Sequence, residues 1–444
     1  MRVSLAYGRS GLEVELPDSA VVVTPKHCPA TTDPARAVRT ALRAPVAGPP
    51  LRDVVRRGQS VAIAVCDGTR PQPRDIVVPA LLDELSASVD LNDITVLVAT
   101  GTHRANTPVE LEAMLGAEVL RAVRVVNHDA RDDSSLAFFG TCGEGVPVYL
   151  NREWLEADVR ITTGFIEPHF FAGFSGGPKL VAPGLAGLAT TLVLHDAKRI
   201  GDPRATWAVL EGNPVHDDIR AISAATGVNF ACDVVLNREQ QIVAVFAGEL
   251  FAMHAAGCVL AKEIAMQLVP GRFDVVVTTN AGFPLDQNLY QSVKGQSAAA
   301  EIVRPGGLIV AACECSDGFP DYGSYRELVT KYDSPQALSA AIKSSATTLP
   351  DQWVIQVQAR ILEKARVAMH ADGLTNAELA AANFVPVDDI SNYVREELER
   401  GGPNATCCVL PEGPLTVPYL EPDGQSSGGP APRPAPVRGA KNSR

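Results

Sequence analysis

The segment 167–184 brings together types of side chain that seldom serve a packed core. It reads EPHFFAGFSGGPKLVAPG, and His195 follows eleven residues after its last glycine. Glycine allows the backbone to approach a ligand closely, because it carries no side chain. His169, Lys179 and His195 offer a base, an amine and a metal-binding nitrogen within fewer than thirty residues. This combination predicts a reaction centre.

Two classes of hydrolase use motifs that this segment partly matches. Zinc hydrolases often carry two histidines on one helical face in a His-Glu-x-x-His pattern, but His169 and His195 lie too far apart in the sequence for it. Residues 173–177 fit the loose Gly-x-Ser-x-Gly pattern of a nucleophile elbow, but Pro178 interrupts the helix that should follow the serine. The sequence therefore disfavours both a zinc-dependent hydrolase and a serine hydrolase.

Strands and helices alternate along the first half of the chain, and this alternation places the polar motifs. Short apolar runs bounded by turn residues predict strands, and the longer periodic segments between them predict helices. The expected strands cover residues 61–65, 94–99, 123–126 and 158–163, and the expected helices cover 75–86 and 107–115. Such alternation predicts an α/β fold with a largely parallel sheet covered by helices on both faces.

A second series of alternating elements begins near residue 270. A helix over 250–268 precedes it, strands are expected at 273–278 and 307–312, and helices at 296–303, 325–331, 354–364, 376–382 and 388–400. We therefore predict two α/β domains, an N-terminal domain over 1–270 and a C-terminal domain over 271–410. The first fifty residues indicate a small hairpin and a connecting loop.

The last part of the chain, residues 411–444, is rich in Pro, Gly and Ser. From residue 421 onward it contains few large apolar side chains, so it cannot bury enough surface to offset the entropy lost on ordering. We predict a disordered tail there.

Polar motifs follow two of the expected strands, at the edge of a parallel sheet where ligands gather. Asp67, Thr69 and Arg70 follow the strand at 61–65, and the guanidinium could grip a carboxylate or phosphate with two hydrogen bonds. A turn in which Asp67 caps backbone amides and pairs with Arg70 is the alternative. His103 follows the next strand and could act as a base in the same crevice. His128 has a similar but weaker context.

A third motif follows the expected strand at 273–278. Tyr290, Gln291 and Lys294 have helical spacing, so one helical face could present a phenol, an amide and an ammonium together. An exposed polar face is the alternative. Because the motif lies at a strand end, it predicts a second wall of an interdomain cleft.

Composition limits the kinds of partner. The formal net charge of −12 argues against a nucleic-acid partner, because phosphate backbones favour clustered Lys and Arg. The N-terminus lacks the apolar core of a signal peptide, and the apolar runs are far shorter than a membrane span. Nine cysteines without a Cys-x-x-Cys pair indicate buried thiols in a reducing compartment. We therefore expect a cytoplasmic protein without a membrane partner, and a small anionic substrate is possible.

Taken together, these motifs resemble those of the nickel-pincer lactate racemase family, whose members racemise or epimerise lactate and other 2-hydroxy acids. The specific motifs lie between residues 60 and 300, and a looser similarity continues to about residue 410. The resemblance implies two α/β domains with the active site between them. It also implies a nickel ion held by a dithio-modified pyridinium mononucleotide, which dedicated cofactor-synthesis proteins would make.

The resemblance also implies roles for individual residues. Lys179 would be joined covalently to the cofactor, and His195 would complete the nickel coordination, which suits imidazole chemistry. His103 and His169 would be the paired acid and base on opposite sides of the substrate. One histidine would remove the hydroxyl proton while the C2 hydride moves to the cofactor, because no side chain accepts a hydride.

Further positions match the family less directly. The residues expected to hold the substrate anion are Arg70, Tyr290, Gln291 and Lys294, and those on the cofactor side are Asp67 and Thr69. Trp353 could be a hydrophobic cover over the cleft or a core residue. Pro178 departs from the residue expected before the lysine. A homologue that binds an anionic metabolite or nucleotide without catalysis is the alternative to a racemase.

Overall fold

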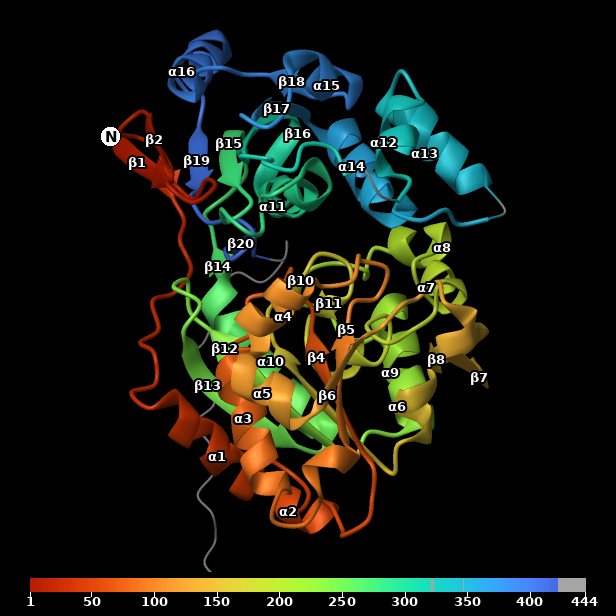
Figure 1. Cartoon of the computed structure of the whole chain (residues 1–444). Coiled ribbons are helices and arrows are strands. Elements are labelled where there is room, and N and C mark those ends of the chain that lie inside the picture. The colour runs from red at the N-terminus through yellow and green to blue at the C-terminus, as the bar shows by residue number, and fades with distance from the viewer. Residues whose placement is uncertain (321–322, 346, 422–444) are drawn as a thin grey trace, which may run out of the picture.

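The structure is a computed structural model that describes residues 1–320, 323–345 and 347–421. It contains two six-stranded sheets, one in each of the two units seen in Figure 1, and helices pack against both. Both sheets are largely parallel, which confirms the predicted α/β fold class. Among the described residues, no helix is long and apolar enough to cross a membrane.

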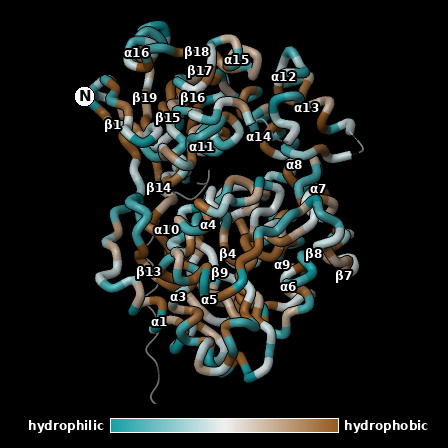
Figure 2. Tube along the Cα trace, in the orientation of Figure 1, coloured by the Kyte–Doolittle hydropathy of each residue, from teal (hydrophilic) through white to brown (hydrophobic). Residues whose placement is uncertain are grey.

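The first sheet has the strand order β13-β12-β9-β4-β5-β6. Its strands are β4 (Val61–Cys66), β5 (Ile94–Ala99), β6 (Arg124–Asn127), β9 (Val159–Phe165), β12 (Phe230–Leu236) and β13 (Ile242–Gly248). Neighbouring strands run parallel except β12 and β13, which are antiparallel. All of β4 is buried, as expected for a central strand covered on both faces. Figure 2 shows hydrophobic segments gathered inside this unit.

Helices and a hairpin surround the first sheet. The helices are α1 (Pro34–Arg43), α2 (Leu51–Val54), α3 (Arg74–Leu85), α4 (Pro108–Leu115), α5 (Ala117–Ala122), α6 (Arg152–Glu156), α7 (Leu188–Leu194), α8 (Ala197–Gly201), α9 (Pro214–Thr226) and α10 (Leu250–Ala265). The hairpin consists of β7 (Leu136–Cys142) and β8 (Val146–Asn151), and α7 packs on β8. A capping box between Thr107 and Glu110 starts α4, as its sequence favours.

The second sheet has the strand order β18-β17-β16-β15-β19-β3, and its pairings are parallel. Its strands are β3 (Val21–Val22), β15 (Phe273–Thr279), β16 (Val303–Ala312), β17 (Arg366–His370), β18 (Val385–Pro386) and β19 (Cys407–Leu410). Its helices are α11 (Leu289–Ile302), α12 (Tyr325–Thr330), α13 (Pro335–Ser344), α14 (Gln352–Lys364), α15 (Asn376–Ala381) and α16 (Ile390–Gly401).

The start of the chain lies with the second sheet, although we expected it in the N-terminal domain. The predicted hairpin forms as β1 (Arg2–Leu5) and β2 (Leu12–Glu15), but its buried residues pack with those of β15 and β16. Strand β3 then pairs with β19. The apolar alternation of a short strand does not say which sheet it joins, because that choice depends on residues nearly 400 positions away. The boundary near residue 270 stays a prediction.

Residues 411–420, which we grouped with the Pro/Gly-rich end of the chain, contain a strand. Strand β20 (Val417–Tyr419) pairs in parallel with β14 (Met266–Leu268), so residues 411–420 are folded. The same pairing ends the helix predicted over 250–268 at Ala265. Residues 422–444, where we predicted disorder, lie outside the described residues.

Candidate active site

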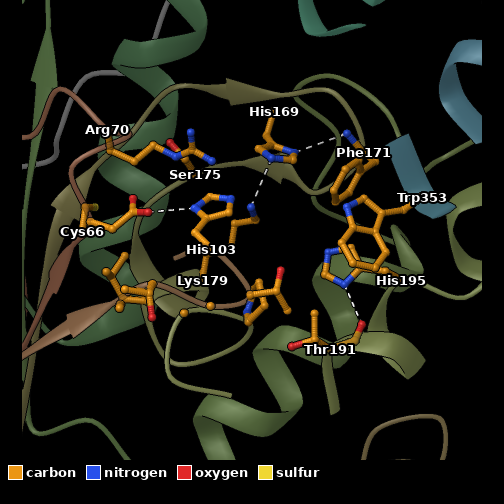
Figure 3. A pocket seen from close by; sticks show the side chains of 18 of the residues that line it. Cys66, Arg70, His103, His169, Phe171, Ser175, Lys179, Thr191, His195 and Trp353 are labelled. Carbon is orange, nitrogen blue, oxygen red and sulfur yellow. Dashed lines mark hydrogen bonds and ion pairs between the residues drawn. The ribbon is translucent and has the colours of Figure 1, made fainter. Parts of the chain in front are cut away.

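A cavity of about 140 Å³ lies between the strand ends of the first sheet and helices α11 and α14 of the second unit. Its walls include every predicted site residue except Thr69: Asp67, Arg70, His103, His169, Lys179, His195, Tyr290, Gln291 and Lys294. In Figure 3, His103, His169, Lys179 and His195 surround one common space. The residues that the motifs singled out separately are therefore neighbours, at a site shared by both units.

His103 is held by the carboxylate of Asp67. Its Nδ1 lies 2.8 Å from Asp67 Oδ2, and the Thr69 hydroxyl donates to Asp67 Oδ1 at 2.8 Å. Burial opposes the ionisation of Asp67, but the charge and hydrogen bond of His103 outweigh it and lower the carboxyl pKa to about 2. An ionised Asp67 keeps a proton on Nδ1, so Nε2 of a neutral His103 carries the lone pair. Asp67 thus pairs with His103 rather than with Arg70.

Two further residues, Gln72 and Arg74, hold the loop after β4, and we did not predict a role for either from the sequence. Arg74 is buried, and its guanidinium donates to the carbonyl oxygens of Asp67 at 3.1 Å and Arg70 at 3.2 Å. Gln72 accepts from the Cys66 amide at 2.8 Å. These hydrogen bonds satisfy loop groups that water would otherwise solvate, and they fix where Asp67 and Arg70 point. A charged residue at the first turn of a helix was the only sequence signal.

His169 lies in β10 (Pro168–His169), a two-residue strand paired with β11 (Gly173–Phe174). Its Nδ1 accepts from the backbone amides of Phe171 at 3.4 Å and Ala172 at 3.3 Å, and its Nε2 lies 3.1 Å from Lys179 Nζ. Burial, reinforced by the charges of Lys179 and Lys294, holds the His169 pKa well below its usual range. A neutral ring that accepts at Nδ1 carries its proton on Nε2 and can donate it to a neutral Lys179 amine.

Lys179 points into the cavity from η3 (Gly177–Leu180), a single turn of 3-10 helix. Pro178 sits at the start of this turn, where a missing backbone N–H is tolerated, so the departure from the family pattern leaves the lysine in place. Burial lowers the pKa of Lys179 to about 7, and the nearby charge of Arg70 adds to the effect. A large fraction of Lys179 is therefore the neutral, nucleophilic amine near neutral pH.

We expect Lys179 in cofactor-free protein to react with amine reagents at unusually low pH. Brief trinitrobenzenesulfonate labelling, followed by peptide mass spectrometry across pH 5 to 11, should give a Lys179 labelling rate with a midpoint of about 7. An ordinary lysine has a pKa of about 10.4. A Lys179 midpoint near that ordinary value would contradict the buried, cation-flanked environment.

His195 ends α7 and presents one nitrogen to the cavity. Its Nδ1 lies 2.8 Å from the Thr191 carbonyl oxygen, to which it donates, and this leaves the lone pair on Nε2 (Figure 3). Burial lowers the His195 pKa to about 4, against the opposing effect of the Thr191 hydrogen bond. A carbonyl that fixes the tautomer of a neutral imidazole is the usual support for a metal-binding histidine.

Trp353 covers His195 from the second unit. The two ring centres lie 4.7 Å apart, and the indole Nε1 donates to the Tyr290 hydroxyl at 3.0 Å. Trp353 is buried and also lines the cavity, so it is both a core residue and a cover over the cleft, the two interpretations that the sequence left open.

Helix α11 supplies the opposite wall. The Asn288 side chain caps its start, seven residues before the predicted position, and so brings Tyr290, Gln291 and Lys294 into the first two turns. Lys294 Nζ donates to Gln291 Oε1 at 2.6 Å. Burial lowers the Lys294 pKa well below its usual range, and the charge of Arg70 acts in the same direction. Gln291 is buried and Tyr290 and Lys294 are half-buried, so these side chains form a wall of the cavity rather than an exposed polar face.

Glu167 lies beside the cavity without lining it, and we did not assign it a role from the sequence. It shares an electrostatic environment with Arg70, Lys294 and Lys179, whose charges oppose the rise in carboxyl pKa that its burial causes. The one signal was its place at the head of the motif. By contrast, His128 is buried and bonded through Nε2 to the Ala186 carbonyl at 3.0 Å, outside the cavity walls.

Comparison with known proteins identifies the family. Residues 7–208 match the Lactate racemase N-terminal domain, and residues 269–417 match the Lactate racemase C-terminal domain. The chain is 34% identical over 417 residues to a lactate racemase of Thermoanaerobacterium thermosaccharolyticum, covering 93% of this chain and 97% of the relative. It is 35% identical over 383 residues to a lactate racemase of Lactiplantibacillus plantarum, covering 85% of this chain and 89% of the relative.

Solved structures agree with this assignment. The lactate racemase apoprotein from T. thermosaccharolyticum superposes with a TM-score of 0.88 at 33% identity, covering 94% of this chain and all of the other. A protein from Thermotoga maritima, at 17% identity and a TM-score of 0.66, covers 87% of this chain and 98% of its own and shares the fold. The chain therefore belongs to the lactate racemase family of isomerases, a family that uses a nickel cofactor.

Proposed function

We propose that this protein racemises a small 2-hydroxy acid, with lactate as the first candidate because both named relatives are lactate racemases. One observation supports this most strongly. His103 and His169 reach a single cavity from separate segments of the chain, together with the Arg70 guanidinium and the Lys294 amine. A racemase needs two such bases, because either enantiomer can arrive.

The same cavity suits the nickel-pincer nucleotide of the family. Lys179 would carry it, because a lysine with a pKa of about 7 supplies the neutral amine that an amide-type link requires. His195 would complete the nickel coordination through Nε2. Within the described residues, no group of three or more His, Cys, Asp or Glu side chains could hold a metal, so a nickel ion here would take other ligands from the nucleotide.

The residues of the chain divide the reaction between them. The Arg70 guanidinium binds the substrate carboxylate as a cation, and the Lys294 amine donates a hydrogen bond to it. One of the two histidines accepts the hydroxyl proton while the other, on the opposite side, stands ready to return one. The bound cofactor supplies a reversible acceptor for the C2 hydride. Phe171 and Trp353 enclose the site and limit access of water to it.

Screening single enantiomers tests the activity and finds the substrate. Protein made together with the cofactor-synthesis proteins should convert one enantiomer of lactate to an equal mixture, followed by the loss of optical rotation. Protein made without them is the matched control and should leave the rotation unchanged. A panel of larger 2-hydroxy acids shows whether the cavity limits the size of the substituent at C2 of the substrate. If the loaded protein changes the rotation of none of them, it is a binding protein rather than a racemase.

Removing the His195 imidazole should separate metal binding from cofactor attachment. We expect His195→Ala to retain the mass added at Lys179 but to lose nickel, because the imidazole contributes one coordination bond and no covalent link. Intact-mass analysis and metal analysis of the same sample measure the two quantities, with the wild-type protein as the reference. Full nickel content in the variant would contradict the assigned role of His195.

A further inference from the structure

Asp233 is a buried carboxylate that the reaction described above does not use. It lies in the middle of β12 with none of its surface exposed, and it does not line the cavity. Its Oδ1 accepts from the Gly164 amide at 2.7 Å, and its Oδ2 accepts from the Gly177 amide at 2.5 Å. One side chain thus joins strand β9 to the turn that precedes Lys179.

The two amides that Asp233 accepts from enclose the most reactive part of the chain. The segment between Gly164 and Gly177 contains Glu167 and His169, and Lys179 follows two residues after it. A carboxylate that holds both ends of this segment fixes the distance between them. Displacement of either end would therefore move the imidazole and the amine relative to each other.

His254 of α10 supports the same turn from a second direction. Its ring bonds through Nε2 to the Ser175 carbonyl oxygen at 2.9 Å. Burial lowers the His254 pKa to about 4, so the ring is neutral and its Nε2 can donate this bond. Asp233 and His254 together form a polar floor under residues 175–177.

The turn fits this floor only because it is made of glycine. Gly176 and Gly177 have φ values of 70° and 50°, which side chains rarely adopt. A Cβ atom on Gly176 would lie 2.6 Å from Asp233 Oδ2, and one on Gly177 would lie 2.5 Å from the His254 ring. Gly176 and Gly177 thus allow the backbone to approach Asp233 and His254 closely. From the sequence, we expected the glycines of segment 167–184 to allow a close approach to a ligand.

We propose that Asp233 is a positioning residue that, with His254, holds the turn before Lys179 so that the amine faces His169 and the cavity. A buried carboxylate is unfavourable in a sheet interior, and among the described residues Asp233 accepts its hydrogen bonds from backbone amides rather than from a cation. Burial accordingly raises its pKa to about 6. Such a group is better explained by a positioning task than by a gain in stability.

Asp233→Asn tests this proposal in cofactor-free protein. The side-chain nitrogen of the asparagine cannot accept a hydrogen bond from one of the two backbone N–H groups. The turn should therefore loosen, and the Lys179 side chain should become more exposed to solvent. Because burial is the main cause of its low pKa, the labelling midpoint of Lys179 should rise from about 7 by about one unit or more. This readout does not depend on the cofactor, so it tests the floor even if Lys179 is not the attachment residue.

A second readout links the floor to the proposed function, on which it rests. In protein made with the cofactor-synthesis proteins, the fraction of Asp233→Asn with added mass at Lys179 should fall by about tenfold or more, because attachment depends on geometry. Asp158→Asn is the matched control. Asp158 also accepts from a backbone amide, that of Ser60 at 2.9 Å, but at the opposite end of the same sheet. It should change neither readout.

Gly177→Ala tests the floor from the side of the turn, and it carries the test if Asp233→Asn does not fold. Its methyl group must push the turn away from His254, so it should raise the Lys179 midpoint in the same direction. The proposal is overturned if a folded variant loses thermal stability but keeps the wild-type labelling midpoint and full loading. That result would assign Asp233 to stability alone.

Discussion

Lys179→Ala is expected to remove both the added cofactor mass and the racemase activity. The alanine cannot form a covalent link, and an untethered cofactor would lose the fixed position that the reaction requires. We expect kcat/KM to fall at least about 1000-fold, as when a covalently placed group becomes a separate reactant. Intact-mass analysis and the optical-rotation assay on the same preparation measure the two effects.

Lys262→Ala is the control for this prediction. Lys262 is exposed on α10, outside the cavity walls, so its removal tests the loss of a lysine without loss of the site. It should keep both the mass and the activity. A Lys179→Ala protein that still carries the added mass would show that the cofactor is attached elsewhere.

Replacing either cavity histidine by asparagine should slow racemisation in both directions. His103→Asn and His169→Asn each remove one of two proton-transfer groups, and general acid–base catalysis contributes about 100-fold to 10,000-fold to a rate. We expect kcat to fall by a factor in that range from either enantiomer, because the same transition state is crossed both ways. Initial rates from each pure enantiomer measure it.

His103→Asn should keep the added mass at Lys179, because His103 contacts Asp67 and not the lysine. His27→Asn, at an exposed position, is the control and should retain activity. If one cavity variant loses activity from one enantiomer only, the pairing of the two histidines is wrong. Full activity in both His103→Asn and His169→Asn would show that neither histidine takes part in proton transfer.

Local patterns were enough to predict most of the structure around the site. Apolar runs such as 61–65 and 94–99 correspond to strands β4 and β5, because a strand buried on both faces needs a continuous apolar stretch. The parallel arrangement then brings the residues after these strands to one edge. This is why Arg70 and His103, 33 positions apart, could be placed in one crevice before any contact was known.

Other features depend on contacts that no local pattern encodes. The pairing of β14 with β20 and of β3 with β19 joins segments far apart in the chain, so no local pattern could show that the helix predicted over 250–268 ends at Ala265 or that β3 joins the second sheet. Asp233 was missed for a similar reason. Its strand reads as a buried apolar run, and a single carboxylate inside such a run was the only available signal.

The fate of the C2 hydrogen tests the central claim most directly. Loaded protein should be incubated with one enantiomer of lactate in D₂O. The two enantiomers should then be separated by chiral chromatography, and their deuterium content should be measured by mass spectrometry. Transfer of a hydride to a bound cofactor and back predicts equal amounts of both enantiomers, with protium retained at C2. Deuterium at C2 of the inverted product would show that a base removes the C2 proton, and would contradict the account.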